Sequence, residues 1–473
     1  MAEITALHEI LNDNPYFCPN NGKCLLVPLH SSLTNEEQNL VFKKTDKHVR
    51  KIVLSTNIAE TSITIDDCVF VIDSGRMKEK RFDSNKNMES LETVWVSRAN
   101  ALQRKGRAGR VMPGVCIHLY TRHCFDYIFI SQPVPEIQRV PLEQLLLKIK
   151  MLPYFSGDRI IEPPSNESIT GAITRLQNLG AFNEFCDLTA LGKHLASLPV
   201  DVRIGKLILF GTIFCCIDSA LTIAACLSYK SPFCWMKVSS QGKHAGMSFA
   251  NENFLSVKTL TTLADIKTQF LELLVDIGFV PRTIKLPRKL NIHGDNPRLL
   301  SAILCAALYP NIVKVLTPEK QYTHSISGAI PMNQKAEELK FETKEEKVVV
   351  IHPSSVNHNI SSFPSPYLVY QEKIKTSRVF IRDCTLVPVL PLVLFSAGTI
   401  RVELYCGQFV VSLGDGWILF TVQSNQVAEL LESIKQEFIT LLEEKIKDPR
   451  MNLQTHPKGR RIVSTIVNLV TYG

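Results

Sequence analysis

The chain has 473 residues, of which 45% are hydrophobic and 21% are charged, a balance typical of folded globular domains. This composition excludes a wholly disordered chain, and the length predicts about three or four domains. The formal net charge of +8 permits a nucleic-acid partner without requiring one, because 45 acidic residues accompany the 53 basic ones.

The cysteines and the apolar segments bear on where the chain works. Thirteen cysteines occur without a Cys-x-x-Cys pair, which favours neither a zinc site nor a secreted disulfide framework, and we assign no metal ligand to this chain. We expect a reducing compartment, the cytoplasm, with the nucleus as an additional location. The longest apolar run, Leu207 to Tyr229, contains Asp218 near its centre, where a carboxylate would cost about 2.5 to 3.5 kcal/mol in lipid. We therefore predict two buried helices broken near Asp218, and no membrane contact.

From Lys23 to Tyr120, apolar strand-like runs alternate with helical ones. Such alternation predicts an α/β fold, with a parallel sheet that helices cover on both faces. Ligands of these sheets bind at the carboxyl ends of the strands. The strands are predicted at 24–29, 51–54, 68–72 and 114–120, and the helices at 36–42 and 98–110.

Hydroxyl-bearing residues crowd the segment that follows the strand predicted at 51–54. This segment, Ser55 to Asp66, starts at the expected carboxyl edge of the sheet. Hydroxyls and free backbone amides at such an edge suit the phosphates of a nucleic-acid backbone. The alternative interpretation is that these Ser and Thr residues only cap the next helix.

A second polar segment, Gln103 to Arg110, contains four basic residues and two glycines. If the helix continues through it, Gln103, Arg107 and Arg110 lie at i, i+4 and i+7 on one face. Converging arginines repel one another unless an anion lies between them, and guanidinium groups suit phosphate oxygens, so we expect a polyphosphate ligand. The alternative is a solvated basic helix end that touches nucleic acid.

Together, the segments 55–66 and 103–110 resemble motifs V and VI of the DEAH-box/RHA family of RNA helicases. Similarity extends along nearly the whole chain, through 135–142, 196–201 and 352–357. Within the family, the chain is most similar to the large member that carries ubiquitin-associated, RWD and CCCH zinc-finger modules. The resemblance implies an enzyme that unwinds or remodels RNA, with ATP and Mg²⁺ as cofactors.

The resemblance also implies roles for individual side chains. Gln103, Arg107 and Arg110 match the residues that hold the γ-phosphate, and Arg110 occupies the position of the arginine finger. Asp66 lies near the ribose, and Phe42 matches the phenylalanine that stacks on the base. The residues implied to contact the RNA backbone are His30, Ser31, Thr61, Ser62, Thr64, Arg76 and Lys78. Without the resemblance, Phe42 would be interpreted as core, and residues 75–81, where the family has a turn that guides the strand, as a solvated loop.

The sequence contains neither Gly-x-x-x-x-Gly-Lys-Ser/Thr nor Asp-Glu-Ala-His, so it lacks the loop that cradles phosphates and the carboxylates that hold magnesium. We therefore expect the C-terminal part of a helicase, inactive alone. Its expected partners are RNA, the N-terminal helicase half in a longer chain, and a protein activator. The alternative is a non-catalytic RNA-binding or partner-binding module, such as a short isoform or a gene fragment.

Four domains are expected from these patterns and the resemblance. They are a second RecA-like helicase domain (1–130), a winged helix (131–200), a shortened helical ratchet-like domain (201–297), and an OB-like β-barrel with a C-terminal helix (298–473). Further helices are predicted at 142–152, 172–180, 188–195, 297–308 and 426–447, and short strands at 347–352, 367–371, 377–383, 387–395, 401–405, 408–413 and 416–422.

Two surface expectations concern these C-terminal domains. Lys373, Lys375 and Arg378 are candidates for an RNA-facing surface of the OB-like domain. The ratchet-like segment is shorter than in the family, which predicts exposed apolar faces on residues 207–229 and poor order at 234–250. The alternative is that Phe233, Trp235, Met236 and Phe249 fold back over those faces.

Overall fold

The structure is a computed structural model, and it separates into two compact units. The first comprises residues 1–81 and 91–139, and the second comprises residues 82–90 and 140–473. The residues described are 2–18, 22–30, 33, 38–46, 48–61, 64–152, 160–229, 231–233, 249–250, 252–282, 287–316, 322–325, 328–331, 336–396, 400–405, 407–413 and 416–472. The four domain boundaries expected from the sequence stay a prediction.

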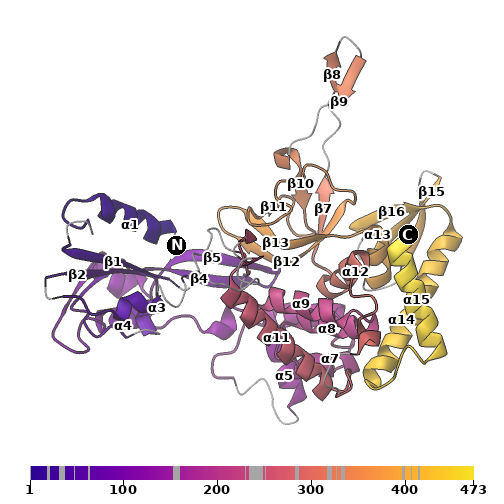
Figure 1. Ribbon diagram of the computed structural model, residues 1–473, viewed down its shortest axis with the longest axis horizontal. Helices are drawn as coiled ribbons and strands as arrows, with labels where there is room; N and C mark the ends of the chain where they lie inside the picture. The colour runs from indigo at the N-terminus through magenta and orange to yellow at the C-terminus, as the bar shows by residue number, and fades with distance from the viewer. Residues whose placement is uncertain are drawn as a thin grey trace. The chain divides into compact units, whose positions relative to one another are not determined.

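The first unit mixes short helices and strands (Figure 1). In chain order, its elements are α1 (Ala2–Asp13), β1 (Cys24–Leu29), the 3₁₀ turn η2 (Leu40–Phe42), β2 (Arg50–Ser55), α3 (Ile58–Thr61), β3 (Phe70–Asp73), β4 (Arg76–Asp83), β5 (Met88–Trp95), α4 (Arg98–Lys105), β6 (Val115–His118), the π-helical turn η3 (Cys124–Ile128) and the 3₁₀ turn η4 (Glu136–Gln138). Helix α1 is not among the predicted elements.

The predicted parallel strands are confirmed, but not as one sheet. In the described residues, β1 pairs with β2 and β3 pairs with β6, both in parallel. Leu29 lies opposite Ser55, so the hydroxyl-rich segment starts at the carboxyl end of the β1–β2 pair, as predicted. Of the helix predicted at 36–42, residues 38–42 are helical, and positions 36 and 37 lie outside the described residues.

The segment 75–81 is neither the loop nor the turn that we expected, because most of it belongs to strand β4, which pairs with β5. Six of the eight residues of β4 are charged and four of these are consecutive, so the strand lacks the apolar alternation that identifies a half-buried strand. Its buried carboxylate, Glu79, lies 3.2 Å from Nε of Arg81. The tip of this hairpin, residues 82–90, belongs to the second unit, where the carbonyl of Ser84 accepts a 2.9 Å hydrogen bond from Arg175.

The second unit starts with helices and continues into strands. Its elements are α5 (Glu143–Met151), α6 (Asn166–Asn178), α7 (Ala190–Ser197), α8 (Val202–Ile213), α9 (Ile217–Ser228), α11 (Val257–Asp276), η6 (Arg288–Asn291), α12 (Pro297–Leu308), β7 (Ile312–Leu316), β8 (Tyr322–Ser325), β9 (Gly328–Pro331), η7 (Ala336–Glu338), β10 (Lys340–Glu342), β11 (Val350–Ile351), β12 (Tyr367–Lys375), β13 (Val379–Leu386), α13 (Val389–Phe395), β14 (Arg401–Tyr405), β15 (Gln408–Leu413), β16 (Ile418–Val422), α14 (Asn425–Lys447) and α15 (Pro457–Tyr472).

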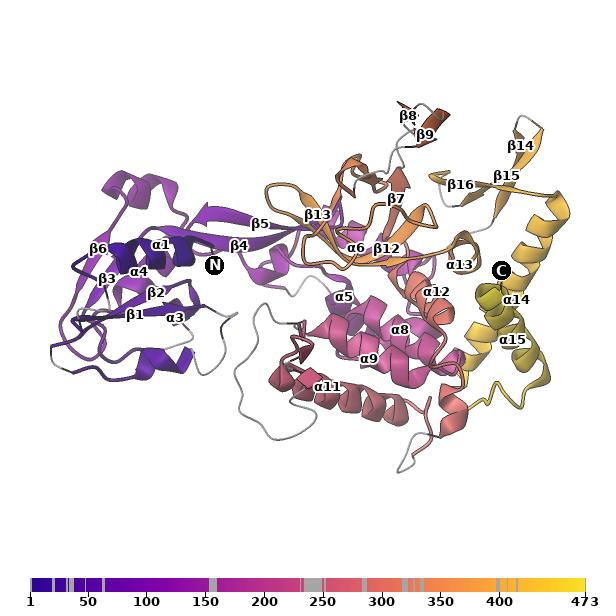
Figure 2. The ribbon, with the colours of Figure 1, turned by 45° about the horizontal axis from the view of Figure 1, so that its top comes forward.

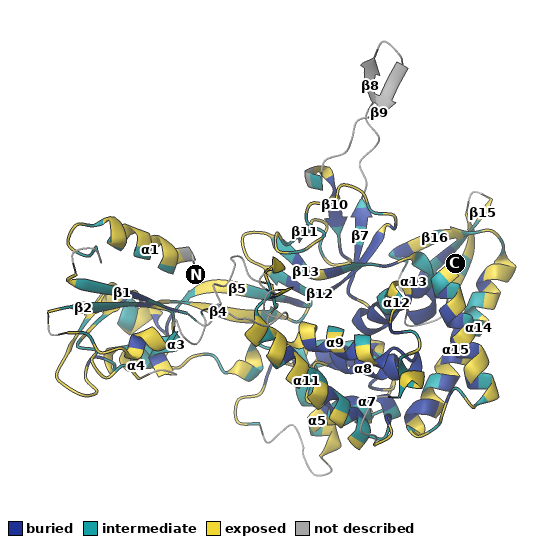
Figure 3. Ribbon diagram, in the orientation of Figure 1, coloured by how far each residue is buried: buried dark blue, intermediate teal, exposed yellow. Residues whose placement is uncertain are grey.

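The apolar run 207–229 forms two helices, α8 and α9, which break just before Asp218, as predicted. The expectation that their faces meet water is wrong, because ten of the twelve residues of α8 are buried (Figure 3). Helix α11 packs along α9, and α12 packs against α8, so these neighbours supply the cover (Figure 2). Most of the segment 234–250 lies outside the described residues.

The strand predicted at 387–395 is instead helix α13, which starts after Pro388. A short apolar run fits a strand and a buried helix equally well, and proline at a position inside the run disfavours a ladder strand. In this helix, Phe395 joins a buried cluster with Phe210, Phe214 and Phe438, with ring centroids 5.6 to 6.2 Å apart. This cluster fastens α8, α13 and α14 to one another.

The expected barrel is an open sheet in the part of the chain that the structure describes. Its strand order is β10-β7-β12-β13-β11, with β5 paired to β12, while β14, β15 and β16 form a separate sheet. Tyr367 and Tyr370 are core residues of this region. Lys373 is buried and lies 2.8 Å from Oε2 of Glu345, so its expected place on an RNA-facing surface is wrong.

Candidate functional site

The segment expected to bind phosphate starts on helix α4. The hydroxyl of Ser97 caps this helix by accepting a 3.1 Å hydrogen bond from the backbone N–H of Asn100. The helix ends at Lys105, and the chain continues in tight turns whose backbone bonds join residues three positions apart. The expectation of one helix through Arg110 is therefore wrong. Gly106 ends it, because glycine loses more backbone freedom than other residues in a helix.

Two of the predicted γ-phosphate residues nevertheless reach one segment of the chain. Arg107 donates through Nε and Nη2 to the backbone carbonyl of Glu60, with Nε 2.7 Å from the oxygen. Nη1 of Arg110 donates to the hydroxyl of Thr64 over 2.7 Å. Desolvation, and then the charge of Arg110, lower the pKa of Arg107. Gln103 is exposed in the last turn of α4 and takes no part in these contacts.

A third arginine, Arg104, was not among the predicted site residues, yet its contacts hold this arrangement in place. Nε of Arg104 lies 2.9 Å from Oε2 of Glu60, and Nη1 lies 2.8 Å from Oδ1 of Asp73. Only 5% of the Glu60 side chain and none of the Asp73 side chain is exposed. Burial lowers the pKa of Arg104, but the bonds to Asp73 and Glu60 outweigh it and raise that pKa overall. Arg104 therefore ties α4 to both α3 and the end of β3.

The two carboxylates have further partners. Asn100 donates to Oε1 of Glu60, and the Tyr120 hydroxyl donates to Oδ2 of Asp73 over 3.2 Å. Burial and the neighbouring Asp73 raise the pKa of Tyr120, so this phenol stays protonated at neutral pH. The sequence does contain both residues, Glu60 in the motif V segment and Arg104 in the motif VI segment. Their spacing in the sequence, however, does not show that the two side chains meet.

The two residues expected to hold the nucleoside are accessible. Phe42 is 53% exposed at the end of η2, so it is not the core residue that the alternative interpretation required. Asp66 is also exposed. Val41, which precedes Phe42, is buried in a small apolar cluster, and Ile65, which precedes Asp66, packs against the same cluster. The backbone before each side chain is therefore anchored while the side chain faces outward.

The residues expected to contact RNA phosphates lie in three places: around the end of α3, just after β1, and on β4. Thr61 ends α3 and Thr64 follows it, and both are exposed beside the arginines described above. His30 is half-buried just after β1, and its carbonyl accepts a 3.3 Å hydrogen bond from Gln38. Ser31 and Ser62 lie outside the described residues.

Arg76 and Lys78 are exposed on β4, yet both have partners within the first unit. The guanidinium carbon of Arg76 lies 3.2 Å from the centroid of the Trp95 ring, and Nζ of Lys78 lies 2.8 Å from Oε1 of Glu3. An RNA phosphate would have to compete with these contacts. Their role in RNA binding stays a prediction.

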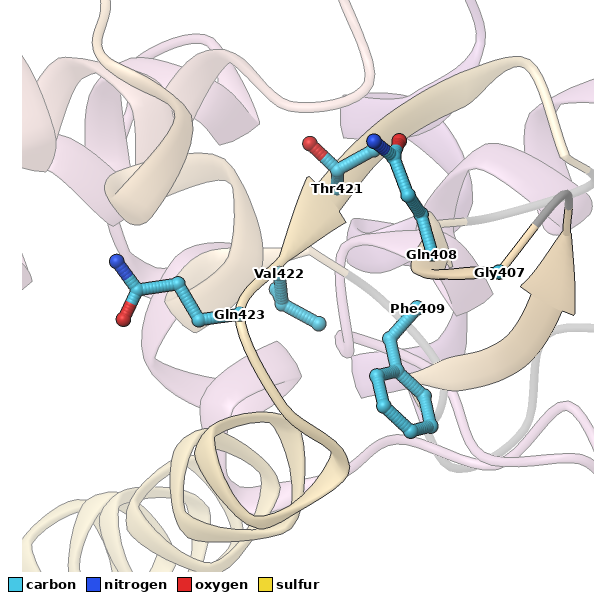
Figure 4. Close-up of a pocket in the computed structure, with 6 residues that line it drawn as sticks. All are labelled: Gly407, Gln408, Phe409, Thr421, Val422 and Gln423. Atoms are coloured by element: carbon cyan, nitrogen blue, oxygen red, sulfur yellow. The ribbon is translucent and has the colours of Figure 1, made fainter.

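A pocket of about 340 Å³ lies elsewhere, between β15 and β16 (Figure 4). Its lining has no ionisable side chain, so it does not offer the chemistry expected of a phosphate site; the lining residues are Gly407, Gln408, Phe409, Thr421, Val422 and Gln423. Among the described residues, no group of three potential metal ligands occurs. In the same part of the chain, no helix has the length and apolar character to span a membrane.

Five family descriptions match successive parts of the chain. They are the helicase conserved C-terminal domain (5–112), the winged-helix helicase-associated domain (172–200), the ratchet-like helicase-associated domain (201–256), the oligonucleotide/oligosaccharide-binding fold (300–399) and the C-terminal domain in RNA helicases (410–472). The order of these matches agrees with the order of domains expected from the sequence.

The chain is also similar along nearly its whole length to proteins named as helicases. It is 50% identical to the human putative ATP-dependent RNA helicase DHX57, over all of this chain and 38% of the relative. It is 38% identical to the mouse ATP-dependent DNA/RNA helicase DHX36 and to the Arabidopsis thaliana DExH-box ATP-dependent RNA helicase DExH1, over 99% of this chain and 49% and 48% of those proteins. The human match has 530 aligned positions against 473 residues here, so the relative has a further 57 without a counterpart.

The chain thus spans about half or less of each of these relatives. The matched domains, their order and the paired motif V and motif VI segments agree with one another. On these grounds the chain corresponds to the C-terminal half of the DEAH-box RNA helicases.

Proposed function

We propose that this chain is the part of an ATP-dependent RNA helicase that supplies the arginine finger and one of the RNA backbone contacts. One observation carries the proposal. Arg107 and Arg110, the expected γ-phosphate residues, both donate hydrogen bonds to the segment 60–64, which contains the expected RNA contacts Thr61 and Thr64. A movement of the segment 60–64 when RNA binds would therefore also move Arg107 and Arg110, the residues expected to face ATP.

The residues present fit the terminal phosphate and the nucleoside of ATP. Arg107 and Arg110 are both cationic and close enough for the charge of Arg110 to lower the pKa of Arg107, so an anion between them would relieve their repulsion. Phe42 and Asp66 are exposed and available to a base and a ribose. ATP, when bound, supplies the phosphoryl group whose transfer to water drives helicases.

Within that reaction, the residues of this chain bind and orient. Arg110 would place its guanidinium against the charge that develops on the transferred phosphoryl group. Arg104 would hold the turn that carries it, through Glu60 and Asp73. We assign the magnesium ligands and the phosphate-binding loop to the N-terminal helicase half of a longer chain, since the sequence has neither motif. We also propose an activating protein partner and a cytoplasmic location that extends to the nucleus.

A second function is favoured by the same missing motifs. Without a phosphate-binding loop, this chain by itself would act as a non-catalytic module that occupies RNA or helicase partners. Both functions share RNA binding, and they differ in whether ATP hydrolysis appears once the upstream region is present.

A chimera tests the choice. The portion of the human relative that precedes the matched region is joined to this chain, and RNA-stimulated ATP hydrolysis is compared with that of the chain alone. We expect turnover by the chimera and none by the chain alone. A folded, RNA-binding chimera without stimulated turnover would support the non-catalytic function.

A further inference from the structure

A buried lysine connects the two residues expected to hold the nucleoside. Lys51, the second residue of β2, is 7% exposed at its side chain. Its Nζ lies 2.7 Å from the carbonyl oxygen of Val41, 3.2 Å from that of Lys43 and 2.8 Å from Oδ2 of Asp67. An ammonium group has three N–H donors, so these three acceptors match its donor capacity.

The partners of Lys51 flank the exposed side chains on both sides of the site. Val41 and Lys43 precede and follow Phe42, so two carbonyls that bracket this residue are held by one ammonium group. Asp67 directly follows Asp66 and accepts from the same ammonium. Lys51 therefore joins two segments that are 24 positions apart in the sequence at the points where the expected nucleoside contacts emerge.

Apolar packing also supports the two segments that carry Phe42 and Asp66, but it does not determine the distance between these two side chains. Val41 belongs to the small cluster that contains Val27 and Leu29, and Ile65 packs against that cluster. Packing of this kind anchors each backbone, whereas directional bonds from a single group fix one segment relative to the other. The buried charge is matched to acceptors on both segments, so a shift of either segment would leave it incompletely paired.

We propose that Lys51 is a positioning residue for the nucleoside of a bound nucleotide, holding Phe42 and Asp66 at a fixed separation. The inference rests on the proposed function, because the roles of Phe42 and Asp66 belong to it. Lys51 itself does not touch the nucleotide, and it acts through the two backbone segments. A pre-organised pair of contacts binds without the ordering cost that two independent segments would incur.

The test is equilibrium binding of a fluorescent ADP to the chimera, followed by the KM and kcat of ATP hydrolysis. Lys51→Met keeps the aliphatic stem and removes the donors. We expect the dissociation constant and the KM to rise about fivefold to tenfold, with kcat within about twofold. Asp67→Asn should produce a smaller rise in the same direction. Lys44→Met, at an exposed lysine nearby, is the matched control and should change nothing.

A double variant separates positioning from general support of the fold. If Lys51 acts through Phe42, Phe42→Ala and the pair Phe42→Ala with Lys51→Met should bind ADP with nearly the same affinity. The inference would be overturned if the double variant lost ADP affinity by the product of the two single losses. It would also be overturned if Lys51→Met bound ADP with unchanged affinity. RNA affinity serves as the check on folding, and it should stay within about twofold of the parent.

The outcomes also distinguish this inference from the proposed function. A chimera that binds and hydrolyses ATP normally after Lys51→Met contradicts the role of Lys51 alone. A parent chimera that binds ADP without RNA-stimulated hydrolysis contradicts the proposed function, while its ADP affinities still decide the role of Lys51. A parent chimera that binds no ADP contradicts both.

Discussion

Replacing Arg104 with methionine should destabilise the first unit more than any exposed substitution on the same helix. Methionine keeps much of the stem volume but removes both ion pairs, to Glu60 and to Asp73. Breaking a buried pair by removing one partner costs about 3 to 5 kcal/mol. Asp73 keeps hydrogen bonds from Tyr120 and from the backbone of Gly75, so we expect a loss near the lower limit, about 3 kcal/mol.

Urea unfolding followed at Trp95 measures this loss, because Trp95 packs on Phe129 within the first unit. The chain has three tryptophans, so the assay uses a background in which Trp235 and Trp417 are phenylalanine. With a slope of about 1 to 3 kcal/mol per molar urea, the midpoint should fall by about 1 to 3 M.

Lys105→Met is the matched control for this measurement, since Lys105 is the exposed neighbour of Arg104 on α4. It should move the midpoint by less than about 0.5 M, because a surface substitution changes stability by no more than about 0.5 kcal/mol and the slope is at least about 1 kcal/mol per molar urea. Equal small shifts of the urea midpoint for both variants would refute the view that the ion pairs of Arg104 stabilise the first unit.

Three further expectations concern RNA binding, the core and pH. RNA affinity of the chain should fall at least about tenfold between 50 and 200 mM salt, and Thr64→Val should weaken poly(U) and poly(A) equally in filter binding. Phe438→Ala should cost about 3 to 5 kcal/mol in urea unfolding followed at Trp417, because it opens the four-phenylalanine cluster. Lys445 has its pKa lowered to about 8, chiefly by burial. Between pH 8 and about 10.4, Lys445 is protonated in the unfolded chain and largely deprotonated in the folded one. The free energy of unfolding of the parent, relative to that of Lys445→Met, should therefore rise with pH by about 1 kcal/mol per unit. A difference in urea midpoints that does not change with pH would contradict this.

Much of the fold follows from local pattern, and the failures have physical causes. The strand at 24–29 and the helix at 297–308 were predicted with their observed bounds, because each is mostly apolar over a length typical of its kind of element. Strand β4 was missed because its residues are mostly charged, and its pairing with β5 is not visible in its own sequence. The burial of α8 was mispredicted because the cover comes from α12, about ninety residues further along the chain.

The candidate site shows the same division. The resemblance carried Arg107, Arg110 and Thr64 to positions that the structure brings together. Periodicity failed at Gly106, where a helix end replaces the continuous face that we expected. The connecting residues Arg104 and Lys51 could not be predicted, because their function lies in contacts with residues 8 to 44 positions away in the sequence, which no spacing rule specifies.

The assignment of Arg110 as the arginine finger is tested by the RNA-stimulated kcat of the chimera after Arg110→Ala. Arg110 is exposed and its one described bond is to Thr64, so its loss should leave folding intact. We predict that kcat falls about 10³- to 10⁵-fold, the range for arginine fingers, while RNA affinity stays within about twofold of the parent. Arg122→Ala, at an exposed arginine of the same unit, should leave kcat unchanged. A fall in kcat of less than about tenfold for Arg110→Ala would show that Arg110 is not the arginine finger.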